Sequence, residues 1–202
     1  MPSRTVAVIG AGNIGSTLAR KWVGAGHRVM LGVRDPAGPR ASGLVHELGG
    51  AVSATSIAEA AATGGVVAFA ITGNAMAATL EGLRRPLRGK VVIDATGPAH
   101  SLALIAKAAP TASGLYRAFN SLGWEILADP VVGGTVADMF FAGPDGAGRA
   151  TVAGLIADVG LRPIWLGGLE RADLADALGV LWFALVSDQS RGRRVALKML
   201  GA

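Results

Sequence analysis

The sequence predicts an α/β protein, with a doubly wound, mostly parallel sheet and a small α/β lobe at its C-terminal end. In the first half of the chain, short apolar runs rich in β-branched residues alternate with alanine-rich stretches of helical periodicity. This alternation is typical of a parallel sheet flanked by helices. The runs are apolar at nearly every position, as strands covered on both faces should be. A glycine-rich turn separates the first run from the first helical stretch.

Strands and helices are expected to alternate through the first part of the chain. The expected strands are Thr5–Ile9, Arg28–Leu31, Ala51–Ser53, Val66–Ile71, Lys90–Asp94 and Leu115–Phe119. The expected helices are Asn13–Ala25, Arg40–Leu48, Ser56–Ala62, Asn74–Leu83 and Leu102–Ala109. In the first helix, Ile14, Leu18 and Trp22 recur at helical spacing and form one apolar stripe that faces the sheet.

The rest of the chain, residues 124–202, predicts the small lobe. Its expected elements are a strand, a helix capped by Asp145, a second strand and then two helices. The first three are expected at Asp138–Ala142, Ala147–Asp158 and Pro163–Leu166. No proline- or serine-rich linker separates residues 1–123 from residues 124–202, so the lobe is expected to pack directly on the sheet.

The composition excludes several classes of function. The 202 residues are 51% hydrophobic and 16% charged, which is ample for a core and unlike a disordered chain. There is no cysteine and the three histidines are scattered, so neither a disulfide scaffold nor a zinc site is expected. The net charge is +5, but aromatic residues make up only 5% and no long basic block occurs. We therefore expect no nucleic-acid partner.

No segment of the sequence predicts a membrane anchor or a targeting signal. The longest apolar run near the C-terminus, Val180–Val186, is far shorter than the ~20 residues that a spanning helix needs. The first residues lack the pattern of a signal peptide. The expected location is the cytoplasm.

The strongest motif is the G-x-G-x-x-G sequence Gly10-Ala11-Gly12-Asn13-Ile14-Gly15, which follows the first strand and opens the first helix. In this context it is the dinucleotide-binding pattern of Rossmann-type folds. Gly10 makes the tight turn, Gly12 lets a pyrophosphate approach the backbone, and Gly15 lets the helix lie close to the strand. Residues 1–123 are therefore expected to form a Rossmann-type dinucleotide-binding domain.

The end of the second strand favours NADP as the coenzyme. NAD-specific sites place a carboxylate here to accept a hydrogen bond from the ribose 2′-hydroxyl. This chain has Gly32 at that point, followed by Val33 and Arg34, and a guanidinium suits a 2′-phosphate. The alternative is that Asp35 rather than Arg34 faces the ribose, in which case NAD is preferred.

Further strand ends belong to the same rim, because ligands bind outside the carboxyl ends of parallel strands. After the fourth and fifth strands, small side chains leave room for the nicotinamide ribose, with Asn74 and Thr96 as hydrogen-bonding groups. After the sixth strand, Asn120 and Ser121 are candidates to orient a carboxamide or an acceptor ring. Trp124 is a candidate to stack on the acceptor, although core packing explains it equally well.

No pair of side chains predicts acid–base catalysis. A histidine–carboxylate or lysine–tyrosine arrangement is not evident in the sequence, so no catalytic acid or base is named. Hydride transfer between two rings needs mainly close, parallel placement and exclusion of water, and the cofactors supply the reactivity.

Several segments spread over nearly the whole chain resemble the family of F-420-dependent NADP oxidoreductases, which link NADPH to the 5-deazaflavin coenzyme F-420. They are GAGNIG, GVRDP, VVIDATGP, FNSLGWE, AGPD, GLRPIWLGGLE and the C-terminal helical pair that ends in VALKML. The resemblance implies that Ala11 to Ile14 wrap the pyrophosphate and that Val33 and Arg34 hold the 2′-phosphate. It also implies that Ile71 and the stretch from Asn120 to Leu122 border the nicotinamide. Residues 124–202 would then cover the nicotinamide and acceptor site, with the deazaflavin in the cleft between domain and lobe.

Other functions stay open at this point. A flavin or an imine could be the acceptor, although imine and β-hydroxyacid reductases usually append a long helical domain. A non-catalytic module that binds NADP and regulates a partner is a further alternative. The apolar face that contains Leu178, Leu181, Trp182 and Leu185 could close the core or join two chains, and a homodimer is favoured.

Overall fold

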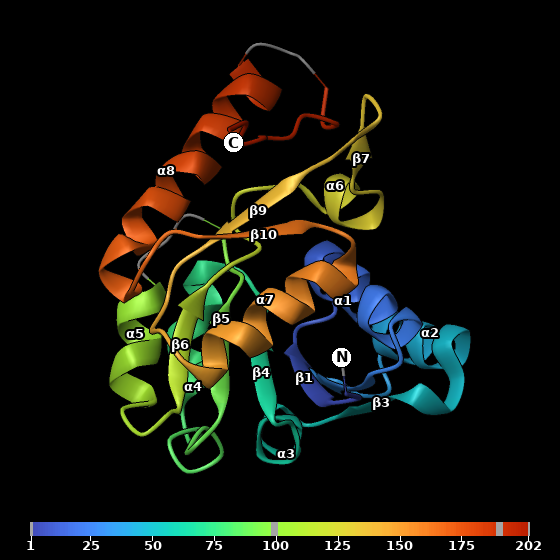
Figure 1. Cartoon of the computed structure of the whole chain (residues 1–202). Coiled ribbons are helices and arrows are strands. Elements are labelled where there is room, and N and C mark those ends of the chain that lie inside the picture. Colours follow the sequence, from blue (N-terminus) through green and yellow to red (C-terminus); the bar gives the residue numbers. More distant parts are fainter. Residues whose placement is uncertain (1, 98–100, 189–191, 202) are drawn as a thin grey trace.

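The centre of the structure is a parallel sheet of six strands in the order β3-β2-β1-β4-β5-β6. The structure is a computed structural model that describes residues 2–97, 101–188 and 192–201. The strands are β1 (Thr5–Ile9), β2 (Arg28–Gly32), β3 (Val52–Thr55), β4 (Val66–Phe69), β5 (Val91–Asp94) and β6 (Gly114–Arg117). Because the order reverses between β1 and β4, the carboxyl ends of these two strands frame the point at which doubly wound sheets bind ligands. The predicted α/β class and doubly wound topology are confirmed (Figure 1).

Helices cover both faces of this sheet (Figure 1). One face carries α1 (Asn13–Gly24), α2 (Pro39–Leu48) and α7 (Ala147–Val159). The other face carries α3 (Ile57–Thr63), α4 (Met76–Leu80) and α5 (Ser101–Ala108). Along β1, Val6 and Val8 join the core of the first face together with Trp22, whereas Ala7 and Ile9 join the core of the second. This alternation explains why the strands are apolar throughout, since each buried aliphatic side chain contributes ~1.5–3 kcal/mol on either face.

The lobe begins with α6 (Trp124–Ala128) and a short hairpin of β7 (Val131–Val132) and β8 (Thr135–Val136). It continues with β9 (Asp138–Phe141) and β10 (Arg162–Trp165), which pair in parallel, and with α8 (Ala172–Phe183). An antiparallel bridge joins Arg117 to Ala142, at the ends of β6 and β9. Met139 and Trp182 of the lobe belong to the same buried cluster as Val6, so lobe and sheet share one apolar core.

The helix expected at Asn74–Leu83 is shorter in the structure. A 3₁₀ turn at Gly73–Ala75 leads into α4, which ends at Leu80. The chain then turns at Gly82, whose φ is 76°. A positive φ takes the backbone out of the right-handed helical region, so the helix cannot continue to Leu83.

The prediction of a second helix at the C-terminal end is wrong for the described residues. α8 runs into a π-helical turn at Ala184–Asp188, and residues 192–201 form no regular secondary structure. Their backbone bonds to distant partners instead: the Val195 carbonyl accepts from Trp182 Nε1 at 2.8 Å, and the Met199 amide donates to Asp138 Oδ2 at 2.7 Å. Backbone groups used in this way cannot take part in a helical ladder.

Asp145 does not cap α7, contrary to expectation. The N-cap position is occupied by Gly146, with a φ of 107°, and makes no side-chain capping bond. The Asp145 carboxylate accepts from the Gly146 amide at 2.6 Å and pairs with Arg149 Nε at 3.2 Å. The other end of α7 is as expected, because Gly160 adopts the left-handed conformation that ends helices. Among the described helices, none is long and apolar enough to cross a membrane.

Candidate functional site

The glycine-rich turn between β1 and α1 leaves free space at the start of the helix. Gly10 has a φ of 104°, and a Cβ there would lie 2.7 Å from the Ala70 carbonyl oxygen, so glycine is required. A Cβ on Gly15 would overlap the Gly10 carbonyl oxygen, which explains how α1 begins so close to β1. Gly12 differs, because no atom lies within 4 Å of a Cβ built on it. The space beside Gly12 is therefore available to a ligand.

The amino end of α1 opens onto this space. Its N-cap residue, Gly12, makes no side-chain hydrogen bond, and the first turn contains no acidic residue. The first amide groups of a helix lack intrahelical partners and carry a partial positive charge. The turn can therefore receive an anionic group such as a pyrophosphate.

A cleft of about 1030 Å³ runs from this turn along the carboxyl ends of β1, β2, β4 and β5. It brings together most of the residues expected to bind the coenzyme: Gly10, Ala11, Gly12, Asn13, Ile14, Val33, Arg34 and Ile71. Gly15 lies behind the turn and does not line it. The small residues Thr72, Ala95 and Gly97 of the predicted strand ends line it as well. The cleft also contains residues that sequence reasoning missed, among them Arg40, Ala75 and Thr79. Within the described parts of the chain, no group of three potential metal ligands occurs.

The end of the cleft that follows β2 is basic. Arg34 and Arg40 are exposed and line it, and neither pairs with an acidic side chain among the residues that the structure describes. Asp35 also borders the cleft, but its carboxylate turns back on its own loop and accepts the Ala37 amide at 3.2 Å. Two guanidinium groups and one carboxylate thus border this end of the cleft. Arg40 could have been found as a basic residue opening the helix after the second strand.

The opposite end of the cleft, after β4 and β5, has small or apolar side chains. We call Ala95 and Gly97 the wall of the cleft, and Ile71 and Ala75 lie beside them. Asn74 is exposed in the 3₁₀ turn and does not line the cleft. The nicotinamide end predicted from the sequence is therefore built largely of groups without charge.

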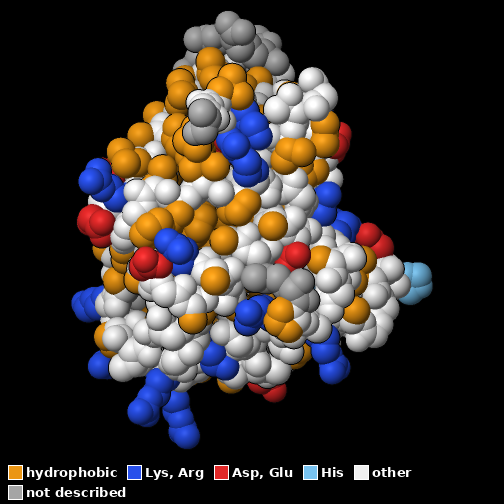
Figure 2. Space-filling model, viewed as in Figure 1, with side chains coloured by type: hydrophobic (Ala, Val, Ile, Leu, Met, Phe, Trp, Pro, Cys, Tyr) orange, Lys and Arg blue, Asp and Glu red, His pale blue; other side chains and the backbone are white. Residues whose placement is uncertain are grey.

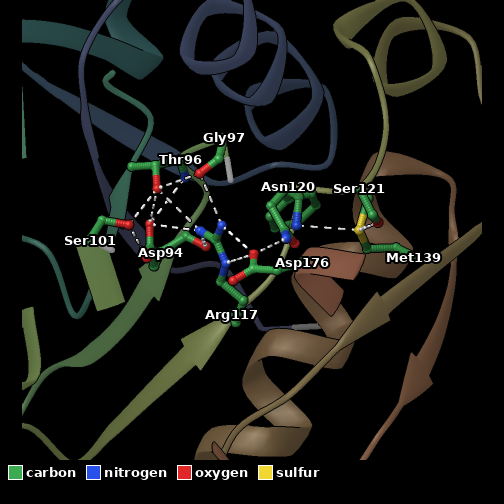
Figure 3. Close-up of polar contacts among 10 residues, drawn as sticks. Asp94, Thr96, Gly97, Ser101, Arg117, Asn120, Ser121, Met139 and Asp176 are labelled. Carbon is green, nitrogen blue, oxygen red and sulfur yellow. Dashed lines mark hydrogen bonds and ion pairs between the residues drawn. The ribbon is translucent and has the colours of Figure 1, made fainter. Parts of the chain in front are cut away.

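Thr96 faces inward rather than into the cleft, as part of a buried polar network behind the wall (Figure 3). Its Oγ1 donates to Asp94 Oδ1 at 2.8 Å and lies 2.6 Å from Ser101 Oγ. Arg117 Nη1 donates to Thr96 Oγ1 at 3.2 Å and lies 3.0 Å from Asp94 Oδ1. Because Asp94 and Arg117 are both fully buried, each charge compensates the other.

Asn120, Ser121 and Leu122 are buried where β6 meets the lobe, and none of them lines the cleft. Asn120 Nδ2 donates to Asp176 Oδ1 of α8 at 2.9 Å (Figure 3). Ser121 Oγ lies 3.8 Å from Met139 Sδ of β9. The structure therefore places these three residues behind the nicotinamide end rather than on its surface.

Trp124 lies elsewhere, at the start of α6 with 38% of its surface exposed. It lines a second hollow of about 460 Å³ beside α1 and α2. This hollow shares Ala11, Gly12, Asn13 and Arg40 with the cleft, but neither Ala95 nor Gly97 of the wall. The structure does not bring Trp124 together with Ser121 and Leu122 in one lining.

One protein-family model matches the first half of the chain. Residues 5–98 match the family model described as NADP oxidoreductase, coenzyme F-420-dependent. The match covers slightly less than half of the chain, so this part of the chain is similar to the family. The matched region contains the glycine turn, Arg34 and the wall of the cleft, so the family's NADP-dependent chemistry and the geometry of the cleft agree.

Solved structures extend the likeness to the lobe. A proposed F-420-dependent NADP reductase from Arthrobacter sp. FB24 has a TM-score of 0.86 and 26% identity, over 98% of this chain and 100% of that one. A hypothetical protein from Sinorhizobium meliloti has a TM-score of 0.74 and 26% identity, over 98% of this chain and 96% of that one. An imine reductase from Streptomyces aurantiacus, at 20% identity and a TM-score of 0.73, covers 90% of this chain but only 61% of that one, and is similar in fold alone. No curated protein matches the sequence.

Proposed function

We propose that this NADP-dependent oxidoreductase transfers a hydride between NADPH and a planar acceptor, the deazaflavin coenzyme F-420. The cleft carries this proposal: it has two guanidinium groups at one end, an open helix terminus in the middle and an uncharged wall at the other end. NADPH has a 2′-phosphate, a pyrophosphate and a flat ring in the same order. The ligand and the cleft therefore match along their length.

The residues present fit this coenzyme. The free space beside Gly12 would admit the pyrophosphate to the first amides of α1. Arg34, with Arg40 beside it, would hold the 2′-phosphate through charge-assisted hydrogen bonds, and Val33 would border the same group. When bound, the nicotinamide ring supplies the hydride.

At the wall and beside it, the protein contributes by placing the nicotinamide ring. Ile71, Ala75 and Ala95 offer apolar surface against a ring and exclude water from it. The side chains that line this end of the cleft among the described residues are small or apolar. Thr96, Asn120, Ser121 and Leu122 are buried behind this end, and Asn74 and Trp124 lie outside its lining, so the direct contacts predicted for these residues are not part of the proposal.

The family and the Arthrobacter structure support F-420 as the acceptor, since both carry this coenzyme in their descriptions. The two guanidinium groups of Arg34 and Arg40 at one end of the cleft support NADP over NAD. A flavin or an imine would be held by the same arrangement. The likeness to imine reductases is one of fold, so it favours no particular acceptor.

The test is an anaerobic assay of the protein with NADPH and oxidised F-420. We expect loss of the acceptor's absorbance that depends on both enzyme and NADPH. Parallel reactions with free flavin and with a cyclic imine identify a different acceptor if F-420 is not reduced. Binding of NADPH without oxidation by any acceptor would instead favour a regulatory module.

We also propose that α8 joins two copies of the chain into a homodimer. Hydrophobic side chains gather over α8 on the face seen in Figure 2. Leu174, Val180, Leu181 and Phe183 are each more than 40% exposed, whereas Trp182 is buried and closes the core. An apolar helix face of this extent is typical of an interface. Light scattering of the wild-type protein should give twice the 20.3 kDa mass of one chain. The variant Leu181→Glu should be a monomer. A monomeric wild-type protein would contradict the proposal.

A further inference from the structure

A chain of polar contacts connects the lobe to the wall of the cleft (Figure 3). It begins at Asp176 of α8, passes through Arg117 at the end of β6 and ends on the backbone of residues 94–97. Ala95 and Gly97 of that segment form the wall, but α8 itself contributes no residue to the lining. A helix outside the cleft is thus connected to its surface.

Arg117 is the central link of this chain. Its side chain is 0% exposed, so each of its donors needs a protein acceptor. Nη1 donates to the Asp94 carbonyl oxygen at 3.3 Å and to Thr96 Oγ1 at 3.2 Å, and Nη2 donates to the Gly97 carbonyl oxygen at 3.1 Å. The guanidinium therefore holds the segment behind the wall at three points. A shift of the guanidinium would move the wall.

Asp176 determines where the guanidinium lies relative to the lobe. Its Oδ1 accepts from Arg117 Nε at 2.8 Å and from Nη2 at 2.6 Å. The other carboxylate on Arg117 is Asp94, which belongs to the segment that is being held. Without Asp176, Arg117 would keep a buried charge partner but would lose its ion-pair tether to α8. Such a change should leave the chain folded, because no buried charge is left uncompensated.

Two unfavourable features lie next to this tether. Phe119 has a φ of 63°, which is strained for a bulky residue and persists only where its surroundings hold it. Asn120, which donates to the same Asp176 oxygen, has a buried Oδ1 without a hydrogen-bond partner among the described residues. Strain and an unsatisfied acceptor together are typical of a region arranged for a ligand rather than for stability.

We propose that Asp176 is a positioning residue for the nicotinamide half of the coenzyme, because through Arg117 it sets the wall against which the ring lies. The inference rests on the proposed function, since it assumes NADP(H) in the cleft. The basic residues Arg34 and Arg40 lie at the other end and make no contact with this chain of residues. Loss of Asp176 should therefore weaken the nicotinamide half and leave the adenosine half unchanged.

The test compares the whole coenzyme with its adenosine half. Calorimetry measures the dissociation constants of NADP⁺ and of adenosine 2′,5′-bisphosphate, which carries the 2′-phosphate but no nicotinamide. In Asp176→Asn and Asp176→Ala, we expect NADP⁺ to bind about tenfold more weakly, with the larger effect in the alanine variant. The fragment should bind as it does to the wild-type protein. If the alanine variant does not fold, the asparagine variant of nearly equal volume gives the same comparison.

Asp158→Asn is the matched control. Asp158 of α7 pairs with His27, the residue just before β2; Asp158 Oδ2 lies 2.9 Å from His27 Nε2. This pair also joins lobe and sheet, but at the amino ends of the strands, on the edge opposite the cleft. The control should lower the melting temperature and leave the affinity for NADP⁺ unchanged.

Three results would overturn the inference. The first is an unchanged affinity of the Asp176 variants for NADP⁺. The second is an equal weakening of NADP⁺ and the fragment, which would indicate a general loss of structure. The third is a selective loss of NADP⁺ binding in Asp158→Asn, since any break between lobe and sheet would then suffice. A wild-type protein that binds neither ligand would refute the proposed function itself, a result distinct from these three.

Discussion

Replacing Arg34 by alanine should change the preference between NADPH and NADH. A hydrogen bond to a charged group contributes about 1.5–3 kcal/mol. Because Arg34 is exposed, solvent screening places its contribution near the lower limit, which corresponds to about tenfold in affinity. Arg40 lines the same end of the cleft and retains part of the attraction in the single variant. The double variant of Arg34 and Arg40 should lose about a hundredfold if the two contributions add.

The assay is a titration of each variant with NADPH and with NADH. NADH lacks the 2′-phosphate, so its dissociation constant should change little in Arg34→Ala. The matched control is Arg28→Ala, which removes an exposed guanidinium from the amino end of the same strand, β2. That variant tests whether a change of net charge alone affects the affinity, and we expect no effect.

Two results would refute this reasoning. Equal losses of NADPH and NADH affinity in Arg34→Ala would mean that the guanidinium does not contact the 2′-phosphate. An equal loss of NADPH affinity in Arg28→Ala would mean that the effect is long-range and not specific to the cleft. If NADH binds more tightly than NADPH to the wild-type protein, Asp35 rather than Arg34 faces the ribose and determines the coenzyme preference.

Three further predictions concern the turn and the lobe. Gly12→Ala should weaken NADPH by about tenfold or more with little change in melting temperature, because its Cβ enters space that is free of protein atoms but needed by the pyrophosphate. Gly15→Ala should lower the melting temperature instead, because its Cβ overlaps the Gly10 carbonyl; thermal melts with and without NADPH distinguish the two variants. Burial alone would raise the pKa of Asp138, but hydrogen bonds from Arg162, the Met199 amide and Lys198 lower it to about 2 from the ordinary 3.8. This carboxylate should therefore contribute about 2 kcal/mol above pH 4, lost as the pH falls through about 2; acid unfolding of Asp138→Asn should lack that component.

The central sheet could be predicted from the sequence because its cause is local. Each strand is covered on both faces, so nearly every position is apolar, and the glycines of the first turn are spaced by steric need. The ends of the elements were less certain, since they depend on single backbone angles. Gly82 ends α4 before Leu83, for example, through a positive φ that composition does not reveal.

The C-terminal segment shows what sequence periodicity misses. Residues 195–200 contain alanine, leucine, lysine and methionine, which favour a helix. Their backbone groups make hydrogen bonds to distant residues instead. The Val195 carbonyl accepts from the Trp182 side chain, the Leu197 carbonyl accepts from the Asp138 amide, and the Met199 amide donates to the Asp138 carboxylate, up to 61 positions away. Helix propensity of a fraction of a kcal/mol per residue is easily outweighed by such contacts.

The buried network divides into a part that the sequence could have indicated and a part that it could not. Arg117 stands inside an apolar strand, and a buried guanidinium requires a carboxylate partner. Asp94 ends the neighbouring strand, and parallel pairing of β5 with β6 brings Asp94 directly opposite Arg117. The ion pair of Asp94 with Arg117 could therefore have been predicted from the sequence. Asp176 was not, because it lies 59 positions from Arg117 on a helix whose pattern is dominated by apolar residues. Local signals thus predict a phosphate site at the glycine turn and at Arg34, whereas the contact proposed to position the wall depends on how the lobe packs and becomes visible only in three dimensions.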